Sequence, residues 1–289
     1  MAAAARELGL VPSAMSYRVR QMEQALDVLL FDRSRRNARL TAAGQELLTA
    51  GSRVLDSLDA LALRVKRVAT GWEPSLTIAI DSLISQDVMF ELCEQFLAIR
   101  APTRIRLLSE TLSGTWEALA TGRADLMLGG VAEDNSSIDY TVRPLGEVSF
   151  VFAVAPRHPL AKAQEPLPDT LIVQQLAIAV ADSSSKGPGL SVGLLAGQPV
   201  FTVPNMPAKL SAQLRGLGCG FLPECLAGPY VESGRLIAKS TERPPRTSRV
   251  SYAWRSNARH GLALKWWIKQ LASAATRQAL LDFRGRQQR

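Results

Sequence analysis

The sequence has few cysteines and histidines and no long uninterrupted hydrophobic run. Its three cysteines, Cys93, Cys219 and Cys225, form neither an even disulfide set nor the C-x-x-C spacing of a metal site. No stretch approaches the roughly 18 apolar residues that span a membrane, and the alanine-rich start lacks the segments of a secretion signal. We therefore expect a cytoplasmic protein with no membrane partner, no disulfide, no metal ion and no other cofactor.

Motifs of common enzyme classes are also missing or weak. There is no G-x-x-x-x-G-K-[ST] phosphate loop, and the glycines of 216–220 lack the dinucleotide-binding spacing. Gly189–Gly193 matches the hydrolase pattern G-x-S-x-G, but the preceding Ser183–Pro188 is polar and turn-like instead of a strand. The only histidines, His158 and His260, lie in connector-like contexts. A serine hydrolase is a remote alternative, and we expect no enzyme activity.

What is present is a globular chain with an uneven charge distribution. Its 289 residues exceed one comfortable hydrophobic core, so two or three domains are expected. Residues 1–70 carry 11 Lys and Arg against 7 Asp and Glu, residues 71–234 carry 10 against 17, and residues 235–289 carry 13 against 2. A basic amino-terminal segment suggests a polyanionic partner.

Two short helices are predicted at the amino-terminal end. Residues 2–8 favour a helix, Gly9 suits a tight turn, and a second helix is expected from about Pro12 to Gln24. Its apolar residues recur at steps of three and four and predict one stripe facing a core; they are Met15, Val19, Met22 and Leu26. The candidate DNA-contacting residues of this helix are Pro12, Ser13, Ser16, Tyr17 and Arg20. This arrangement is typical of a helix that enters the major groove.

The next segment, about Asp32 to Arg39, is predicted to form a β-hairpin wing. Four arginines occur in it, Arg33, Arg35, Arg36 and Arg39. They are placed to neutralise phosphates, which supplies affinity more than sequence discrimination. A solvated charged loop is the alternative interpretation.

A long helix is predicted from Ala42 to Ala69, with Thr41 as its N-cap. Its apolar residues alternate steps of four and three, with Gly51 in one position; they are Leu47, Val54, Leu58, Leu61, Val65 and Val68. This heptad pattern favours pairing with the same helix of a second subunit. One face of an intramolecular bundle is the alternative.

After the helix-breaking segment Gly71–Pro74, strands and helices alternate, which indicates an α/β fold. The expected strands are 76–80, 104–108, 126–128, 148–154, 176–180, 200–203, 220–223 and 249–254, and the expected helices are 87–99, 116–121, 208–214 and 262–275. Two α/β lobes joined by crossing strands would leave a cleft between them. A free-standing two-lobed solute-binding protein without specific DNA binding would satisfy this pattern too.

The segment Ala2–Gly44 resembles the LysR-type transcriptional regulators. The matching positions are Ala4, Ala5, Leu8, Ser13, Ser16, Val19, Met22, Glu23, Leu26, Leu30, Phe31, Arg33, Leu40, Thr41, Ala43 and Gly44. The resemblance implies a winged helix-turn-helix in residues 1–40, a dimerising linker helix in 41–70, and a periplasmic-binding-protein-like effector domain in 74–289. Lobe I would comprise about 74–155 and 255–289, and lobe II about 156–254. It also implies double-stranded DNA and a small-molecule effector as partners, and a homodimer or homotetramer.

In one respect the chain departs from the family pattern. Members normally begin about one helix earlier, so we expect that the first helix is missing and that Leu8, Met15, Val19 and Leu30 are partly uncovered. Either the start site is misassigned or specific DNA binding is impaired.

The resemblance further implies an effector cleft formed by loops after the strands. These loops map to Asp81, Ser82, Leu83, Thr111, Leu112, Ser113, Gly129, Gly130, Ser183, Ser184, Pro204, Asn205 and Met206. Serines near helix N-termini favour an anionic ligand or serve simply as N-caps. A carboxylate at Asp81 would instead favour an amine or hydroxyl, or Asp81 could be an unpaired surface acid or an N-cap. The ligand class stays open at this point.

Overall fold

The computed structural model describes residues 6, 9, 11–32, 39–131, 139–185, 192–256 and 260–282. The chain divides into two compact units, residues 1–66 and residues 67–289.

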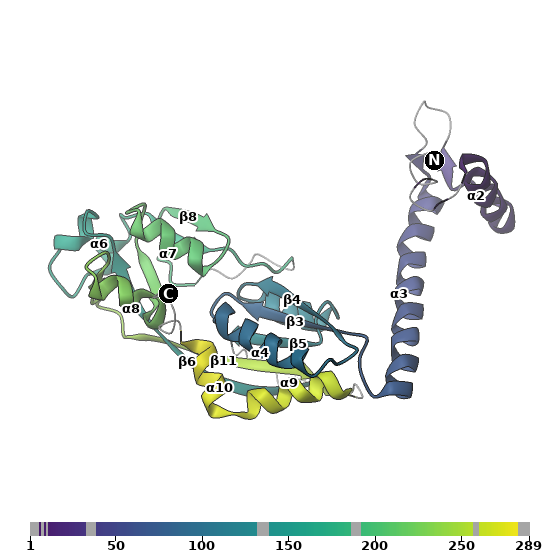
Figure 1. Cartoon of the computed structure of the whole chain (residues 1–289). Coiled ribbons are helices and arrows are strands. Elements are labelled where there is room, and N and C mark those ends of the chain that lie inside the picture. Colours follow the sequence, from purple (N-terminus) through teal and green to yellow (C-terminus); the bar gives the residue numbers. More distant parts are fainter. Residues whose placement is uncertain are drawn as a thin grey trace. The chain divides into compact units, whose positions relative to one another are not determined.

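Among its described residues, the first unit contains two helices and a short hairpin (Figure 1). Its elements are α2 (Pro12–Leu26), β1 (Phe31–Asp32), β2 (Arg39–Leu40) and most of α3 (Ala42–Thr70). The predicted second helix is confirmed, and β1 pairs antiparallel with β2 through Phe31 and Leu40. The hairpin is therefore confirmed, although its predicted phosphate contacts Arg33, Arg35 and Arg36 lie outside the described residues.

The apolar stripe of α2 is only partly buried. Val19 is 5% exposed, but Met22 and Leu26 are 45% and 51% exposed, so the prediction of one continuous core-facing stripe is wrong. The expectation that Val19 and Leu30 are partly uncovered is wrong as well, since Leu30 is 3% exposed, and Leu8 lies outside the described residues. Met15 is half-buried.

Polar contacts of the backbone explain why Leu30 is buried. The Glu23 carboxylate accepts hydrogen bonds from the Leu30 and Phe31 amides at 3.0 and 3.2 Å, which folds the start of β1 back onto α2. Thr41 is confirmed as the cap of α3, because its Oγ1 accepts from the Gly44 amide at 3.0 Å. A Cβ on Gly44 would lie 2.2 Å from the Leu30 carbonyl oxygen, so only glycine permits this close approach.

The heptad positions of α3 remain uncovered within the first unit. Leu47, Val54, Leu58, Leu61 and Val65 are 38% to 61% exposed. An intramolecular bundle would bury them, so this alternative finds no support among the described residues of 1–66. The predicted helix extends from Ala42 to Thr70.

The second unit is built on a seven-stranded sheet with the order β10-β6-β11-β5-β3-β4 and with β9 paired to β6. In its first part, which we call lobe I, β3 (Ser75–Asp81) runs parallel to β4 (Arg104–Glu110) and β5 (Leu126–Val131). Helices α4 (Gln86–Ala98), α9 (Leu262–Ala272) and α10 (Ala274–Leu281) form one core with the sheet, and α5 (Gly114–Ala120) contributes to another. The predicted α/β fold is confirmed.

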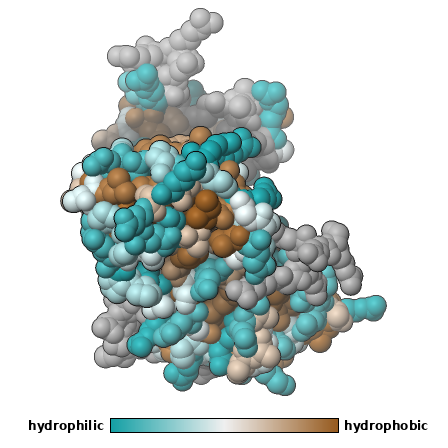
Figure 2. Space-filling view, turned by 90° about the vertical axis from the view of Figure 1, so that its left-hand side faces the viewer, coloured by the Kyte–Doolittle hydropathy of each residue, from teal (hydrophilic) through white to brown (hydrophobic). Residues whose placement is uncertain are grey.

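Lobe II is the second part of this unit and has cores of its own. Its strands are β7 (Ala177–Val180), β8 (Val200–Val203), β9 (Gly220–Pro223) and β10 (Ile237–Lys239), and its helices are η1 (Pro159–Lys162), α6 (Asp169–Ile172), α7 (Met206–Leu214) and α8 (Glu224–Glu232). β7 and β8 are parallel, as the strand-helix alternation predicts. On the face shown in Figure 2, hydrophobic residues form separate patches in a mostly hydrophilic surface.

Two long strands connect the lobes. β6 (Tyr140–Val154) and β11 (Arg246–Arg255) pair antiparallel from Arg246 opposite Phe150 to Arg255 opposite Tyr140 (Figure 1). β6 begins well before the predicted strand 148–154. Val250–Trp254 also pair with β5, which belongs to lobe I. The predicted boundary between the two lobes at residue 254 therefore stays a proposal.

The prediction of one helix from 262 to 275 is wrong, because the structure has two helices there, α9 and α10. Ser273 has extended backbone dihedrals, which end α9, and its hydroxyl accepts from the Thr276 amide at 3.4 Å to begin α10. At the other end of α9, the Glu73 carboxylate accepts from the amides of Gly261, Ala263 and Leu264 at 2.8, 3.0 and 3.4 Å. Glu73 thus caps α9 from a distant part of the chain.

Within the described residues no helix is both long and apolar enough to cross a bilayer. The same residues contain no group of three or more His, Cys, Asp or Glu arranged to hold a metal ion.

Candidate functional site

The outer face of α2 presents the residues predicted to read DNA. Pro12, Ser13, Tyr17 and Arg20 are exposed, and Ser16 is half-buried. The Ser16 hydroxyl donates to the Pro12 carbonyl at 3.0 Å, so at rest it is engaged with its own helix. Tyr17 is 63% exposed and its hydroxyl accepts from Gln21 Nε2 at 3.1 Å.

Arg39 extends this surface from the hairpin, where it is exposed on β2 and pairs through its backbone with Asp32. A helix face and a neighbouring basic strand are therefore both available to a nucleic acid within the first unit.

In the second unit, Asp81 at the end of β3 ties two predicted loops together. Its Oδ1 accepts from the Leu83 amide and its Oδ2 from the Leu112 amide, both at 2.8 Å. Asp81 is 3% exposed, so the alternative that it is an unpaired surface acid is wrong. It positions the loops that follow β3 and β4.

Gly129 in β5 makes room for this arrangement. It has a φ of +86°, and a Cβ there would lie 2.8 Å from the Asp81 Cβ and 2.9 Å from Ile84 Cγ1. A side chain would therefore displace the β3 loop, which gives Gly129 a structural role beside its predicted one.

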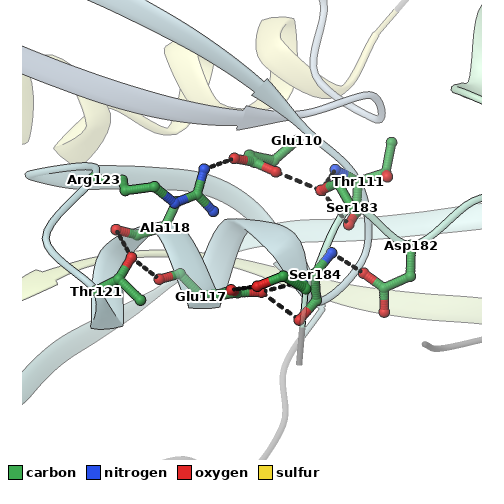
Figure 3. Close-up of polar contacts among 10 residues, drawn as sticks. Glu110, Thr111, Glu117, Ala118, Thr121, Arg123, Asp182, Ser183 and Ser184 are labelled. Carbon is green, nitrogen blue, oxygen red and sulfur yellow. Dashed lines mark hydrogen bonds and ion pairs between the residues drawn. The ribbon is translucent and has the colours of Figure 1, made fainter. Parts of the chain in front are cut away.

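Thr111 joins the loop after β4 to the loop after β7. Its amide donates to Ser183 Oγ at 2.9 Å and its hydroxyl donates to the Ala181 carbonyl at 2.5 Å. The Ser183 amide donates back to the Thr111 carbonyl at 3.3 Å. Ser183 Oγ also donates to Glu110 Oε2 at 2.5 Å. The two lobes are thus hydrogen-bonded to each other at predicted site residues (Figure 3).

A second set of contacts lies beside the first. Ser113 Oγ donates to the Asp182 carboxylate. Glu117 of α5 accepts from the hydroxyls of Ser184 and Ser185, each at 2.5 Å, and from the Ser185 amide at 2.7 Å. Figure 3 shows Glu117, Ser184 and Asp182 side by side between the two lobes. Ser184 and Ser185 are therefore bound to α5 through Glu117.

The remaining predicted residues are placed less centrally. Ser82 is half-buried and forms no hydrogen bond with a described residue. Gly130 packs near Met127 and Trp116, away from Asp81. Pro204 directly follows Val203, whose carbonyl accepts from the Ala181 amide at 2.8 Å.

Asn205 and Met206 have structural roles at the start of α7. Asn205 Oδ1 accepts from the Ala208 amide at 2.9 Å and so caps the helix. Met206 packs against the cores of both lobes.

Sequence reasoning missed four charged residues of the site, Glu110, Glu117, Arg123 and Asp182. Arg123 forms an ion pair with Glu110 at 2.7 Å. We call the carboxylates of Asp81, Glu110, Glu117 and Asp182 the inter-lobe acidic cluster. Each acid lies within six residues of a predicted site serine or threonine, and this proximity is the signal that could have found them.

The cluster has perturbed proton affinities. Burial raises the pKa of Asp81 to about 7, opposed by the amide hydrogen bonds from Leu83 and Leu112 and reinforced by Asp182. The hydroxyls of Ser184 and Ser185 lower the pKa of Glu117 to about 2. Glu117 is therefore ionised at neutral pH, whereas Asp81 is divided between its neutral and charged forms, and Arg123 is the cation paired to Glu110 of the cluster.

A helix face with an adjacent basic hairpin, followed by a two-lobed α/β unit with polar loops between its lobes, defines a ligand-responsive DNA-binding regulator. The LysR substrate binding domain family matches residues 69–276, and the lysR family of bacterial regulatory helix-turn-helix proteins matches residues 1–45. The chain belongs to the LysR family. It is a transcriptional regulator with an effector-binding domain, not an enzyme.

Individual relatives agree with this assignment. The HTH-type transcriptional regulator YeeY of Escherichia coli K12 is 37% identical over 93% of this chain and 87% of its own length. The full-length virulence activator AphB of Vibrio cholerae has a TM-score of 0.58 at 15% identity and covers 93% and 91% of the two chains. Full-length LysG of Corynebacterium glutamicum with bound effector Arg has a TM-score of 0.51 at 24% identity, covering 94% and 91%. The two structures support the fold.

Proposed function

We propose that this regulator reads double-stranded DNA through α2 and the β1–β2 hairpin, and that its effector binds where the loops at 111–113 and 181–185 meet. The observation that carries the effector site is the direct hydrogen bonding of Thr111 to Ala181 and Ser183. An effector that replaces these bonds has a different affinity for the joined and the separated lobes. Such differential affinity is what shifts a conformational population.

The charge of the site favours a particular class of effector. Four carboxyl groups surround the loops, and one of them, Glu110, is paired to Arg123. A ligand that donates hydrogen bonds, such as an amine, an amide or a polyol, would be attracted, while a dianion would be repelled. This proposal selects the amine or hydroxyl alternative over an acidic effector.

The test is a thermal-shift screen of amines, amides, polyols and carboxylic acids on the full chain. A true effector should raise the melting temperature of the wild type and do so much less with Thr111→Ala. Thr170→Ala, at an exposed position on α6 in lobe II, is the matched control and should preserve the response. An effector that stabilises Thr111→Ala fully would place the site elsewhere.

The DNA proposal separates base reading from phosphate contact. Arg20→Ala should reduce discrimination between operator and scrambled DNA, because base-edge hydrogen bonds carry sequence information. Arg39→Ala should weaken binding to both DNAs and lower the slope of log affinity against log salt by about one. Titrations at several salt concentrations measure both effects, and equal effects of the two substitutions would contradict the assignment.

The exposed seam of α3 supports a homodimer, and the family resemblance supports a homotetramer formed through the effector domains as well. Leu58 is 55% exposed in one chain and occupies a central heptad position. Leu58→Asp should dissociate this interface, whereas Ser57→Asp, beside the seam, should not. Sedimentation at low micromolar concentration measures the outcome, and an unchanged assembly for Leu58→Asp would refute the α3 interface.

A further inference from the structure

The inner side of α7 buries two polar side chains inside lobe II. Lys209 is 6% exposed and Gln213 is fully buried, although lysine and glutamine on helices normally reach solvent. They lie one helical turn apart and therefore on the same face of α7. Buried groups of this kind require polar partners.

Both side chains end at one point, above Gly220 of β9. A Cβ on Gly220 would lie 3.4 Å from Lys209 Nζ and 3.2 Å from Gln213 Nε2, and the φ of Gly220 is +151°. Gln213 Nε2 donates to the Gly220 carbonyl at 3.1 Å, but Gln213 Oε1 has no hydrogen-bond partner in the described structure. The Lys209 ammonium has neither an ion pair nor a hydrogen bond with any described residue.

A second cation approaches the same place from β11. The guanidinium carbon of Arg246 lies 5.3 Å from the ring centre of Phe150 and 6.0 Å from that of Phe221, the neighbour of Gly220. Arg246 likewise forms no ion pair with a described residue. Burial, with the charge of Arg246 as a smaller cause, lowers the pKa of Lys209 to about 8. Two like charges thus lie near one interior region, and no described residue forms an ion pair with either of them.

A small cavity adjoins these groups. It has a volume of about 10 Å³ and is lined by Lys209, Gly220, Phe221 and Gly193 among others. This volume accommodates about one water-sized atom. Asp169 also lines the cavity, but both of its oxygens accept from Arg243 Nε at 2.9 Å, so its charge is already compensated.

We infer that lobe II contains an anion site in which one oxygen of a small carboxylate or inorganic oxyanion lies beside Lys209 Nζ, near Arg246. The site is separate from the inter-lobe acidic cluster, and it attracts ligands of the opposite charge. Because Lys209 lies on α7 and Arg246 on a strand that connects the lobes, the bound anion links that strand to lobe II. The regulator would then respond to an anion in addition to its effector.

The test measures thermal unfolding of the full chain in sodium acetate and in sodium sulfate, each against sodium chloride at equal ionic strength. At least one of the two anions should raise the melting temperature of the wild type at pH 7 by roughly 5 °C when present at about a hundred times its dissociation constant. Lys209→Met and Arg246→Met should each lose most of this gain. Lys162→Met, an exposed control on η1, should keep it.

Two further comparisons make the result specific. Sulfate keeps its charge from pH 7 to 9.5. A smaller increase in melting temperature with sulfate at pH 9.5 than at pH 7 would therefore report loss of the Lys209 proton. Thr111→Ala should retain the gain, which separates this site from the proposed effector site. The inference is overturned if neither anion exceeds chloride, or if Lys209→Met and Arg246→Met respond as strongly as the wild type.

Discussion

The two charged regions of the effector domain differ in how their charges are satisfied. In the inter-lobe acidic cluster, Asp81 and Glu117 accept hydrogen bonds from amides and hydroxyls of neighbouring loops. In lobe II, Lys209 and Arg246 face a common interior region without a described counter-ion. The acids hold the loops in place, whereas the cations are available to a ligand and lower the stability of the domain.

Removal of the Asp81 carboxylate should have the largest effect on stability. Asp81→Ala leaves the buried amides of Leu83 and Leu112 without an acceptor, each at a cost of about 1–3 kcal/mol. We expect the free energy of unfolding, measured by urea denaturation, to fall by about 4 kcal/mol. Asp81→Asn retains one acceptor and should lose less. A loss below about 1 kcal/mol for the alanine variant would show that Asp81 does not brace the loops.

The proton affinity of Asp81 gives the next largest effect. Burial raises its folded pKa from 3.8 to about 7, so its contribution to stability is complete below pH 3.8 and is lost as the pH rises through about 7. Between pH 5 and 8 the loss is on the order of 3 kcal/mol. Glu117 acts in the opposite sense below pH 4.5, since its folded pKa is lowered to about 2. Melting temperatures between pH 5 and 8 should therefore fall less steeply in Asp81→Asn than in the wild type, and parallel curves would contradict this.

The serines at the lobe contact should contribute less. Ser183→Ala removes the acceptor of the Thr111 amide and the donor to Glu110, and should cost about 1 kcal/mol in urea denaturation. Ser185→Ala, which loses only a contact with the exposed edge of Glu117, is the matched control and should cost under about 0.5 kcal/mol. If both cost the same, Ser183 has no special part in joining the lobes.

The smallest effect concerns the cations and has the opposite sign. Lys209→Met removes a buried, unpaired ammonium and keeps most of the apolar volume, so without added anion it should stabilise the domain by about 0.5–1 kcal/mol. Lys162→Met, on the surface, should change stability by less than about 0.5 kcal/mol. Chemical denaturation in a buffer free of oxyanions measures the difference, and destabilisation by Lys209→Met would mean that the ammonium has a partner.

The sequence predicted helices and strands better than it predicted contacts between side chains. The helix α2, the cap at Thr41 and the exposed seam of α3 follow from local patterns that depend on a few neighbouring residues. The loops at Asp81, Thr111 and Ser183 were found through the resemblance, which transfers positions along the chain. The bonding partners Glu110, Glu117 and Asp182 were missed, because side-chain networks join residues about seventy positions apart.

Burial was the other property that local patterns could not supply. Lys209 looks like a solvent-facing residue of a predicted helix, and only the packing of α7 over Gly220 reveals that its ammonium is enclosed. Met22 and Leu26 fit an apolar stripe but are exposed, because burial depends on which surface packs against the helix and not on spacing alone. The break at Ser273 likewise needed tertiary structure, since serine is compatible with both a helix interior and a cap.

The bonds of Glu73 have a mechanical consequence. One carboxylate just beyond the end of α3 holds the first turn of α9, and the Leu262 amide donates to the Gly71 carbonyl at 2.8 Å beside it. The segment through which the chain enters lobe I is thereby hydrogen-bonded to α9, a helix near the carboxyl-terminal end of the chain. Because these hydrogen bonds fix the segment 71–73 to α9, we expect the last residues of α3 to move together with lobe I when this lobe rotates.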